Sequence, residues 1–103
     1  MGLIYLITND YIHYKIGYTN KSINERISSI QTGNSEQIDI IKTFNSIHCS
    51  YIEKMLHKQF HDKRIKGEWF ELNDNDIKTF ESSCKKYHDI ANLLQRTNHF
   101  FKP

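Results

Sequence analysis

The chain has 103 residues, of which 38% are hydrophobic and 25% charged, and its net charge is +2. This length suits one domain with a single core, and the composition excludes a disordered chain. No apolar run reaches the length of a membrane span and no signal peptide opens the chain, so we expect an intracellular, cytoplasmic protein. The small positive charge permits nucleic-acid binding without demanding it.

The first twenty residues predict a β-hairpin. Residues 3–8 are apolar and rich in β-formers, and residues 11–19 alternate between apolar and polar side chains. Asn9 and Asp10 separate the two segments and are typical turn residues.

Two helices and a strand are expected in the middle of the chain. Ser22 can cap a helix that ends near Gly33, because three isoleucines repeat on one face of it, namely Ile23, Ile27 and Ile30. Residues 38–44 predict a third strand. Residues 50–61 predict a second helix with an apolar stripe at helical spacing.

The remaining segments complete an α+β fold. Residues 63–67 are expected to form a turn, and residues 68–72 a short strand or extended segment. In it we expect Trp69 and Phe70 to be core anchors, in preference to platforms on which bases stack. A third helix begins at 73–76. We expect one domain over 1–97, with a three-stranded antiparallel sheet (a ββαβα core) flanked by helices and closed by a C-terminal helix. The tail, 98–103, is expected to be loose unless its two phenylalanines dock onto the body.

Two residue types are scarce in this chain. Cys49 and Cys84 are too few and too far apart for a disulfide framework or a zinc site, so we expect buried thiols. Only three arginines accompany eleven lysines. Each of these arginines is either retained by chance or marks a place where the planar guanidinium is needed, and the sequence leaves both interpretations open.

Four short segments occur in an order that resembles the GIY-YIG nuclease superfamily. They are "LIY" at 3–5, "KIG" at 15–17, "YIEKMLHKQF" at 51–60 and "GEWFEL" at 67–72. Thr19 and Arg26 keep the family's spacing after Gly17. The resemblance covers residues 2–72 and is closest to the short, stand-alone, phage-type branch of the superfamily.

The resemblance implies a metal-dependent DNA endonuclease with one Mg²⁺ or Mn²⁺ ion. Tyr5 would act as the general base or position the water, Arg26 would bind the phosphate, and Glu53 would hold the metal. His57 would orient water, contact the phosphate or protonate the leaving group. The remaining assignments are structural roles for Gly17 and Thr19 and DNA contacts for Tyr14 and Tyr18.

Glu53 and His57 also have simpler interpretations. Ser50 and Glu53 fit the S-x-x-E capping box, which would occupy the carboxylate, whereas a helix that begins near His48 would leave it for a metal. His57 lies one turn after Glu53 and fits a partly buried helix histidine equally well. The histidine spacing does not match a zinc signature.

Lys15 stands where the second motif usually has tyrosine, so the hairpin register decides its role. A two-residue loop pairs Tyr5 with Tyr14, whereas a three-residue loop pairs Tyr5 with Lys15. In the second register the apolar and polar side chains of this strand separate more cleanly onto opposite faces of the sheet, and we predict this register. Lys15 would then face Tyr5 and lower the pKa of its phenol.

Three functions remain open from the sequence. The first is the endonuclease. The second is a nucleic-acid-binding module that keeps the scaffold but does not cut, and the third is a protein-interaction subunit of a phage or mobile-element complex. No separate DNA-recognition module is evident, so specificity is expected to be low or to come from DNA structure, a homodimer or a targeting partner protein.

Overall fold

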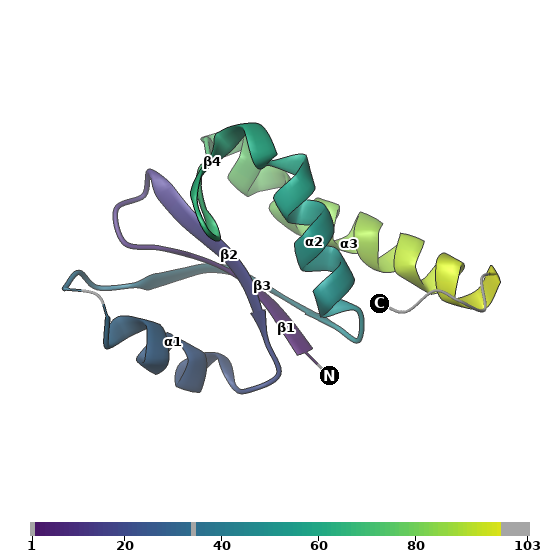
Figure 1. Ribbon diagram of the computed structural model, residues 1–103, viewed down its shortest axis with the longest axis horizontal. Coiled ribbons are helices and arrows are strands. Elements are labelled where there is room, and N and C mark those ends of the chain that lie inside the picture. Colours follow the sequence, from purple (N-terminus) through teal and green to yellow (C-terminus); the bar gives the residue numbers. More distant parts are fainter. Residues whose placement is uncertain (1, 34, 98–103) are drawn as a thin grey trace.

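A five-stranded antiparallel sheet runs through the molecule, and helices cover both of its faces (Figure 1). The computed structural model describes residues 2–33 and 35–97. Its elements are β1 (Gly2–Thr8), β2 (His13–Thr19), α1 (Ile23–Gln31), β3 (Asp39–Ser46), α2 (Cys49–Gln59), a 3₁₀ turn (His61–Lys63), β4 (Arg64–Lys66), β5 (Trp69–Glu71) and α3 (Asp74–Thr97).

The prediction of an α+β fold is confirmed, but the sheet has five strands and not three. Its strand order is β3-β1-β2-β5-β4. The two added strands form a hairpin at Gly67, whose φ of 57° lies in the left-handed region that glycine adopts without strain. What the sequence indicated as a turn over 63–67 is therefore mostly strand, and β5 pairs with the outer edge of β2.

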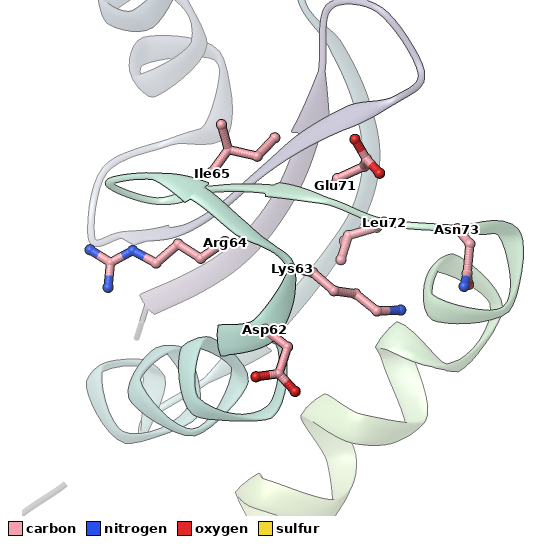
Figure 2. Close-up of a pocket in the computed structure, with 7 residues that line it drawn as sticks. All are labelled: Asp62, Lys63, Arg64, Ile65, Glu71, Leu72 and Asn73. Atoms are coloured by element: carbon pink, nitrogen blue, oxygen red, sulfur yellow. The ribbon is translucent and has the colours of Figure 1, made fainter.

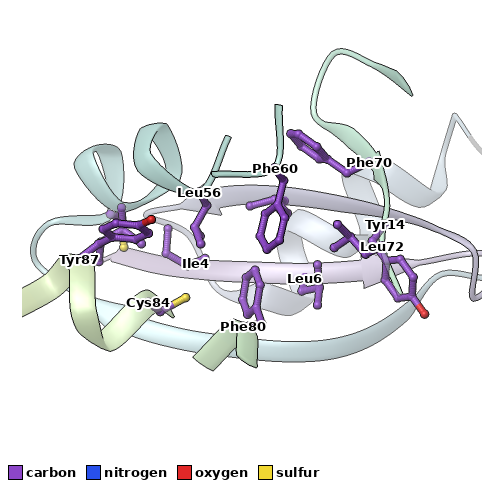
Figure 3. Close-up of a cluster of buried hydrophobic side chains, with 13 residues drawn as sticks. Ile4, Leu6, Tyr14, Leu56, Phe60, Phe70, Leu72, Phe80, Cys84 and Tyr87 are labelled. Carbon is purple, nitrogen blue, oxygen red and sulfur yellow. The ribbon is translucent and has the colours of Figure 1, made fainter. Parts of the chain in front are cut away.

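The sheet separates two apolar layers. On one face Ile4, Leu6 and Ile16 pack under α2 and α3 in the main core (Figure 3). On the other face Tyr5 and Ile7 pack under α1, whose three isoleucines lie against them as the helical spacing predicts. Because side chains alternate along a strand, one apolar strand supplies both layers. Residues of β1 and β2 that face α1 are therefore candidates for a site on that side.

The first hairpin has a longer loop than we predicted. The last pair of the ladder is Thr8–Tyr14, and Tyr5 pairs with Gly17 instead of Lys15. The Thr8 hydroxyl accepts the backbone N–H of Tyr11 at 2.9 Å and donates to the carbonyl of His13 at 2.7 Å, which fixes the wider loop. The register differs by two residues, so Lys15 still shares a sheet face with Tyr5 and Gly17.

The long C-terminal helix α3 closes the main core. Asn73 and Asp76 form a reciprocal cap at its start, because the side chain of each accepts the backbone N–H of the other at 2.9 and 3.0 Å. Cys49 and Cys84 are free buried thiols, as predicted. Burial raises the pKa of Cys84 to about 12. The predicted loose tail and the docking of its phenylalanines lie outside the described residues.

A membrane span would need a longer or more apolar helix than any that the described residues contain.

Candidate active site

The candidate site forms where the outer edge of β2 loses its neighbouring strand. β5 pairs with β2 only as far as Lys15. Beyond it, the N–H of Ile16 donates to the carbonyl of Glu68 at 3.1 Å, and the Nε2–H of His57 donates to the Ile16 carbonyl at 2.9 Å. The next outward N–H, that of Tyr18, faces the carboxylate of Glu53 and opposes the rise in its pKa that burial causes. Two side chains of α2 are thereby fixed against β2.

Gly17 leaves the space that the phenol of Tyr5 fills. A Cβ built on Gly17 would overlap Tyr5 Oη, and it would lie 2.6 Å from Tyr5 Cζ and 3.0 Å from Glu68 Oε2. Real Cβ atoms essentially never come this close to other heavy atoms. The glycine of the second motif is therefore required for close approach, and its backbone needs no special conformation.

We expect Gly17→Ala to destabilise the protein by about 1–3 kcal/mol, the usual cost of overpacking a filled site. Urea denaturation of both proteins measures the difference in the free energy of unfolding. Gly33→Ala is the matched control, because the nearest atom to its Cβ would be Ile30 O at 3.8 Å. Equal stability of Gly17→Ala and Gly33→Ala would contradict the tight contact with Tyr5.

Arg26 reaches Tyr5 from α1. Its Nε–H donates to Tyr5 Oη at 3.1 Å, and this contact joins the first turns of α1 to the middle of β1. Ser22 fixes the start of the helix by accepting the N–H of Glu25. The guanidinium therefore reaches the face of the sheet that α1 covers, and its Nη groups retain further N–H donors.

Tyr5 does not have the lowered pKa that we predicted. Its side chain is fully buried, and this burial raises the pKa above its ordinary value of 10.0. The hydrogen bond and charge of Arg26 lower the pKa, while Glu68 and Glu53 raise it. Burial raises the pKa of Glu53, and the charge of Lys15 opposes that rise, whereas Lys15 is not among the groups that shift the pKa of Tyr5. The phenol is therefore neutral near pH 7, and its cationic partner is Arg26.

Three potential metal ligands converge beside Gly17. Glu53, His57 and Glu68 each offer one ligand atom, and these atoms lie within 4.8 Å of one another. Burial raises the pKa of Glu53, and the negative charge of Glu68 raises it further. Two carboxylates held this close repel one another unless a proton or a cation lies between them.

Glu68 was not predicted as a site residue, although it lies in the "GEWFEL" segment that resembles the family. Its carboxylate reaches the site because the β4–β5 hairpin folds back along β2. The alternative interpretation, in which Glu53 caps the helix in a box with Ser50, is wrong. The helix α2 begins at Cys49, directly after His48, so Ser50 already lies inside it and forms no capping box. The Glu53 carboxylate is thus available for a metal, as the earlier helix start predicted.

A hollow of about 500 Å³ lies over this site. Arg26, Glu53 and Glu68 line it, together with the exposed side of Tyr18 and with Thr19. The Thr19 hydroxyl accepts the N–H of Lys21 at 3.0 Å and so shapes the turn into α1. The hollow thus combines a cationic donor with two carboxylates, which is the combination that phosphodiester chemistry needs.

The profile of the T5orf172 domain matches residues 2–86. The chain belongs to the T5orf172 domain family. This phage-associated domain is related to nucleases of the GIY-YIG and HNH-like kinds, which indicates a nuclease-like or DNA-binding role. No curated protein and no solved structure gave a match.

Two predicted residues of the T5orf172 domain need correction. Tyr14, predicted to contact DNA, is only 6% exposed and packs in the main core with Leu72. Trp69, predicted as a core anchor, is half-buried at the surface, whereas Phe70 is fully buried as expected. The side chains of adjacent strand residues point to opposite faces of the sheet, so only one of the two aromatic rings enters the core.

A second hollow of the T5orf172 domain lies away from this site (Figure 2). It has a volume of about 420 Å³ and is lined by the start of β4, the end of β5 and the segment before α3. Its lysine, Lys63, forms an ion pair with the buried Asp76, and the side chains of Lys63 and Arg64 extend in opposite directions (Figure 2). None of the residues predicted from the sequence to be functional lines this hollow.

Proposed function

We propose that this T5orf172 domain is a metal-dependent endonuclease that hydrolyses DNA phosphodiester bonds at a GIY-YIG-type single-metal site. The observation that carries the proposal is the shared hollow of Arg26, Glu53 and Glu68. A guanidinium beside two converging carboxylates can bind a phosphate and a divalent cation together.

The donor set fits Mg²⁺ or Mn²⁺. Both prefer carboxylate oxygens and keep much of their water, and Glu53 and Glu68 supply such oxygens within 4.8 Å of one another. When bound, the cation would stabilise charge on the departing oxygen and lower the pKa of its water. A structural zinc site would need more nitrogen or sulfur ligands than the single imidazole of His57.

Arg26 would bind a non-bridging phosphate oxygen through its Nη groups. The hydrogen bond from Nε to Tyr5 leaves those groups for the substrate and fixes the plane of the guanidinium. Tyr5 is then a positioning residue, because its phenol is buried, neutral near pH 7 and bonded to Arg26. This role differs from the general base that the family resemblance implied.

His57 supplies the only imidazole of the three potential metal ligands, and an imidazole can both accept and donate a proton. One of its ring nitrogens lies within 4.8 Å of both carboxylate ligand atoms. Its Nε2–H is donated to Ile16, so Nδ1 is the nitrogen that can take up or release a proton. We assign to it the transfer of a proton to the departing 3′ oxygen.

Incubation with supercoiled plasmid and with single-stranded DNA tests this function. We expect strand breaks in Mg²⁺ or Mn²⁺ and none in excess EDTA. Retained DNA binding without cleavage in either metal would contradict the nuclease proposal, and would favour a binding module on the same scaffold. Cleavage that persists in EDTA would contradict the metal site.

A further inference from the structure

The single tryptophan of the chain lies beside the candidate nuclease site. Trp69 pairs with Lys15 across β2 and β5, and Lys15 shares its face of the sheet with Tyr5 and Gly17. Lys15 is two residues from Gly17, or about 7 Å along the strand. Glu68, which lines the nuclease hollow, immediately precedes Trp69. The indole therefore lies close enough to the nuclease hollow to contact the base that adjoins a phosphate bound there.

A separate hollow of about 440 Å³ opens against this indole. Ile65, which is 54% exposed, and Lys66 of β4 also line it. His13 and Glu36 contribute polar groups from the first hairpin and from the loop after α1. The volume is within the roughly 300–1,000 Å³ of small-molecule pockets.

The chemistry of this hollow suits a nucleobase. A base has an apolar face that stacks on an aromatic ring and a polar edge that needs both donors and acceptors. Trp69 and Ile65 provide apolar contact, while the side chains of His13 and Glu36 provide polar groups. Lys15 Nζ lies over the indole ring, 5.9 Å from its centroid, and Lys66, the partner of Trp69 on the next strand, lines the hollow. These two cations would attract the phosphates of a strand whose base enters the hollow.

We propose that this hollow receives an unstacked DNA base next to the cleaved phosphate, with Trp69 as its stacking surface. A base inside a duplex is paired and stacked, so it cannot lie on the indole unless it leaves the helix. The preferred substrate is therefore DNA with at least one unpaired nucleotide at the cleavage point. This inference rests on the proposed nuclease function, because it names the form of DNA on which that site acts.

Intrinsic fluorescence tests the contact directly, because Trp69 is the only tryptophan. In EDTA, the 12-nucleotide oligomer dT12 should quench the emission to saturation. A second 12-nucleotide oligomer, with abasic sites at its central positions, should quench the emission much less. With a dye-labelled dT12, fluorescence anisotropy should show binding about 10-fold or more weaker for Trp69→Ala. Trp69→Phe should retain most of the affinity, because it keeps an aromatic face, and both variants should keep the wild-type circular dichroism spectrum.

Three results would overturn the inference. The first is tryptophan emission that does not change at saturating dT12. The second is a loss of affinity in Trp69→Ala that is the same for dT12 and for the abasic 12-mer. The third is quenching by a blunt duplex that equals the quenching by dT12. The outcome is separable from that of the nuclease proposal. Quenching by dT12 without cleavage in Mg²⁺ would support the base contact while the nuclease proposal fails. Cleavage in Mg²⁺ without quenching in EDTA would overturn the base contact alone.

Discussion

Replacing Glu53 by glutamine should lower the rate of DNA cleavage in saturating Mg²⁺ by roughly 10³-fold or more. The amide keeps the shape of the side chain and a polar oxygen that can face the N–H of Tyr18, but it loses the charge that a hard divalent cation requires. Glu68 would remain as a single carboxylate. Single-turnover cleavage over a range of Mg²⁺ concentrations measures the effect.

The same substitution should not destabilise the metal-free protein. Burial and Glu68 raise the pKa of Glu53 above its ordinary value of 4.5, so the folded state binds that proton more tightly than the unfolded chain does. The free energy of unfolding therefore falls as pH rises from 4.5 through the raised pKa. Glutamine does not titrate, so the free energy of unfolding of Glu53→Gln lacks this decrease with pH. At pH 7.5 in EDTA we expect Glu53→Gln to be more stable by roughly 0.5 kcal/mol, since partial exposure screens the repulsion.

Glu25→Gln is the matched control for this charge. Glu25 lines the same hollow but does not belong to the cluster of potential metal ligands. Cleavage by Glu25→Gln should stay within about threefold of wild type. If Glu53→Gln cleaves as well as Glu25→Gln, then Glu53 does not hold the metal.

Arg26→Lys should lower the cleavage rate by about 10²-fold although the positive charge is kept. An ammonium cannot donate to Tyr5 and present a planar pair of donors to a phosphate at the same time. Lysine and arginine have similar helix propensities, so α1 should remain intact. Single-turnover rates and DNA affinity in Ca²⁺ would separate a defect in rate from a defect in binding.

Arg96→Lys is the control for the change from guanidinium to ammonium. Arg96 is exposed in the last turn of α3. Its replacement should leave the cleavage rate unchanged. A rate for Arg26→Lys that equals that of Arg96→Lys would show that Arg26 acts only as a surface charge.

Local sequence patterns predicted the parts of the fold that depend on periodicity. The isoleucine spacing located α1 and the side of it that packs on the sheet, and alternation along β2 placed Lys15 and Gly17 on the face of Tyr5. Alternation fixes only whether a residue points to one face or the other. It could not distinguish registers that differ by two residues, and the hydrogen bonds of the Thr8 hydroxyl decided between them.

The features of the fold and of the site that were not predicted from the sequence depend on contacts between distant segments. Gly67 adopts a positive φ, and the hairpin that this allows carries Glu68 back to β2. The sequence contains the segment but does not show which strand it joins. The pKa of Tyr5 was predicted wrongly for a similar reason, because burial under α1 outweighs the charge of any neighbour. Trp69 was assigned to the core because hydrophobicity alone does not tell which of two adjacent aromatic residues points inward.

The part of the outer edge of β2 that β5 does not cover has a consequence for solubility. Unpaired N–H and C=O groups on a strand edge are a template for pairing with another chain, which leads to aggregation. Here the ring of His57 donates to the carbonyl of Ile16, and the carboxylate of Glu53 faces the N–H of Tyr18. The two side chains that we place in catalysis therefore also block strand addition. Truncating them to alanine would remove activity and also open this edge, whereas isosteric substitutions would separate the two roles.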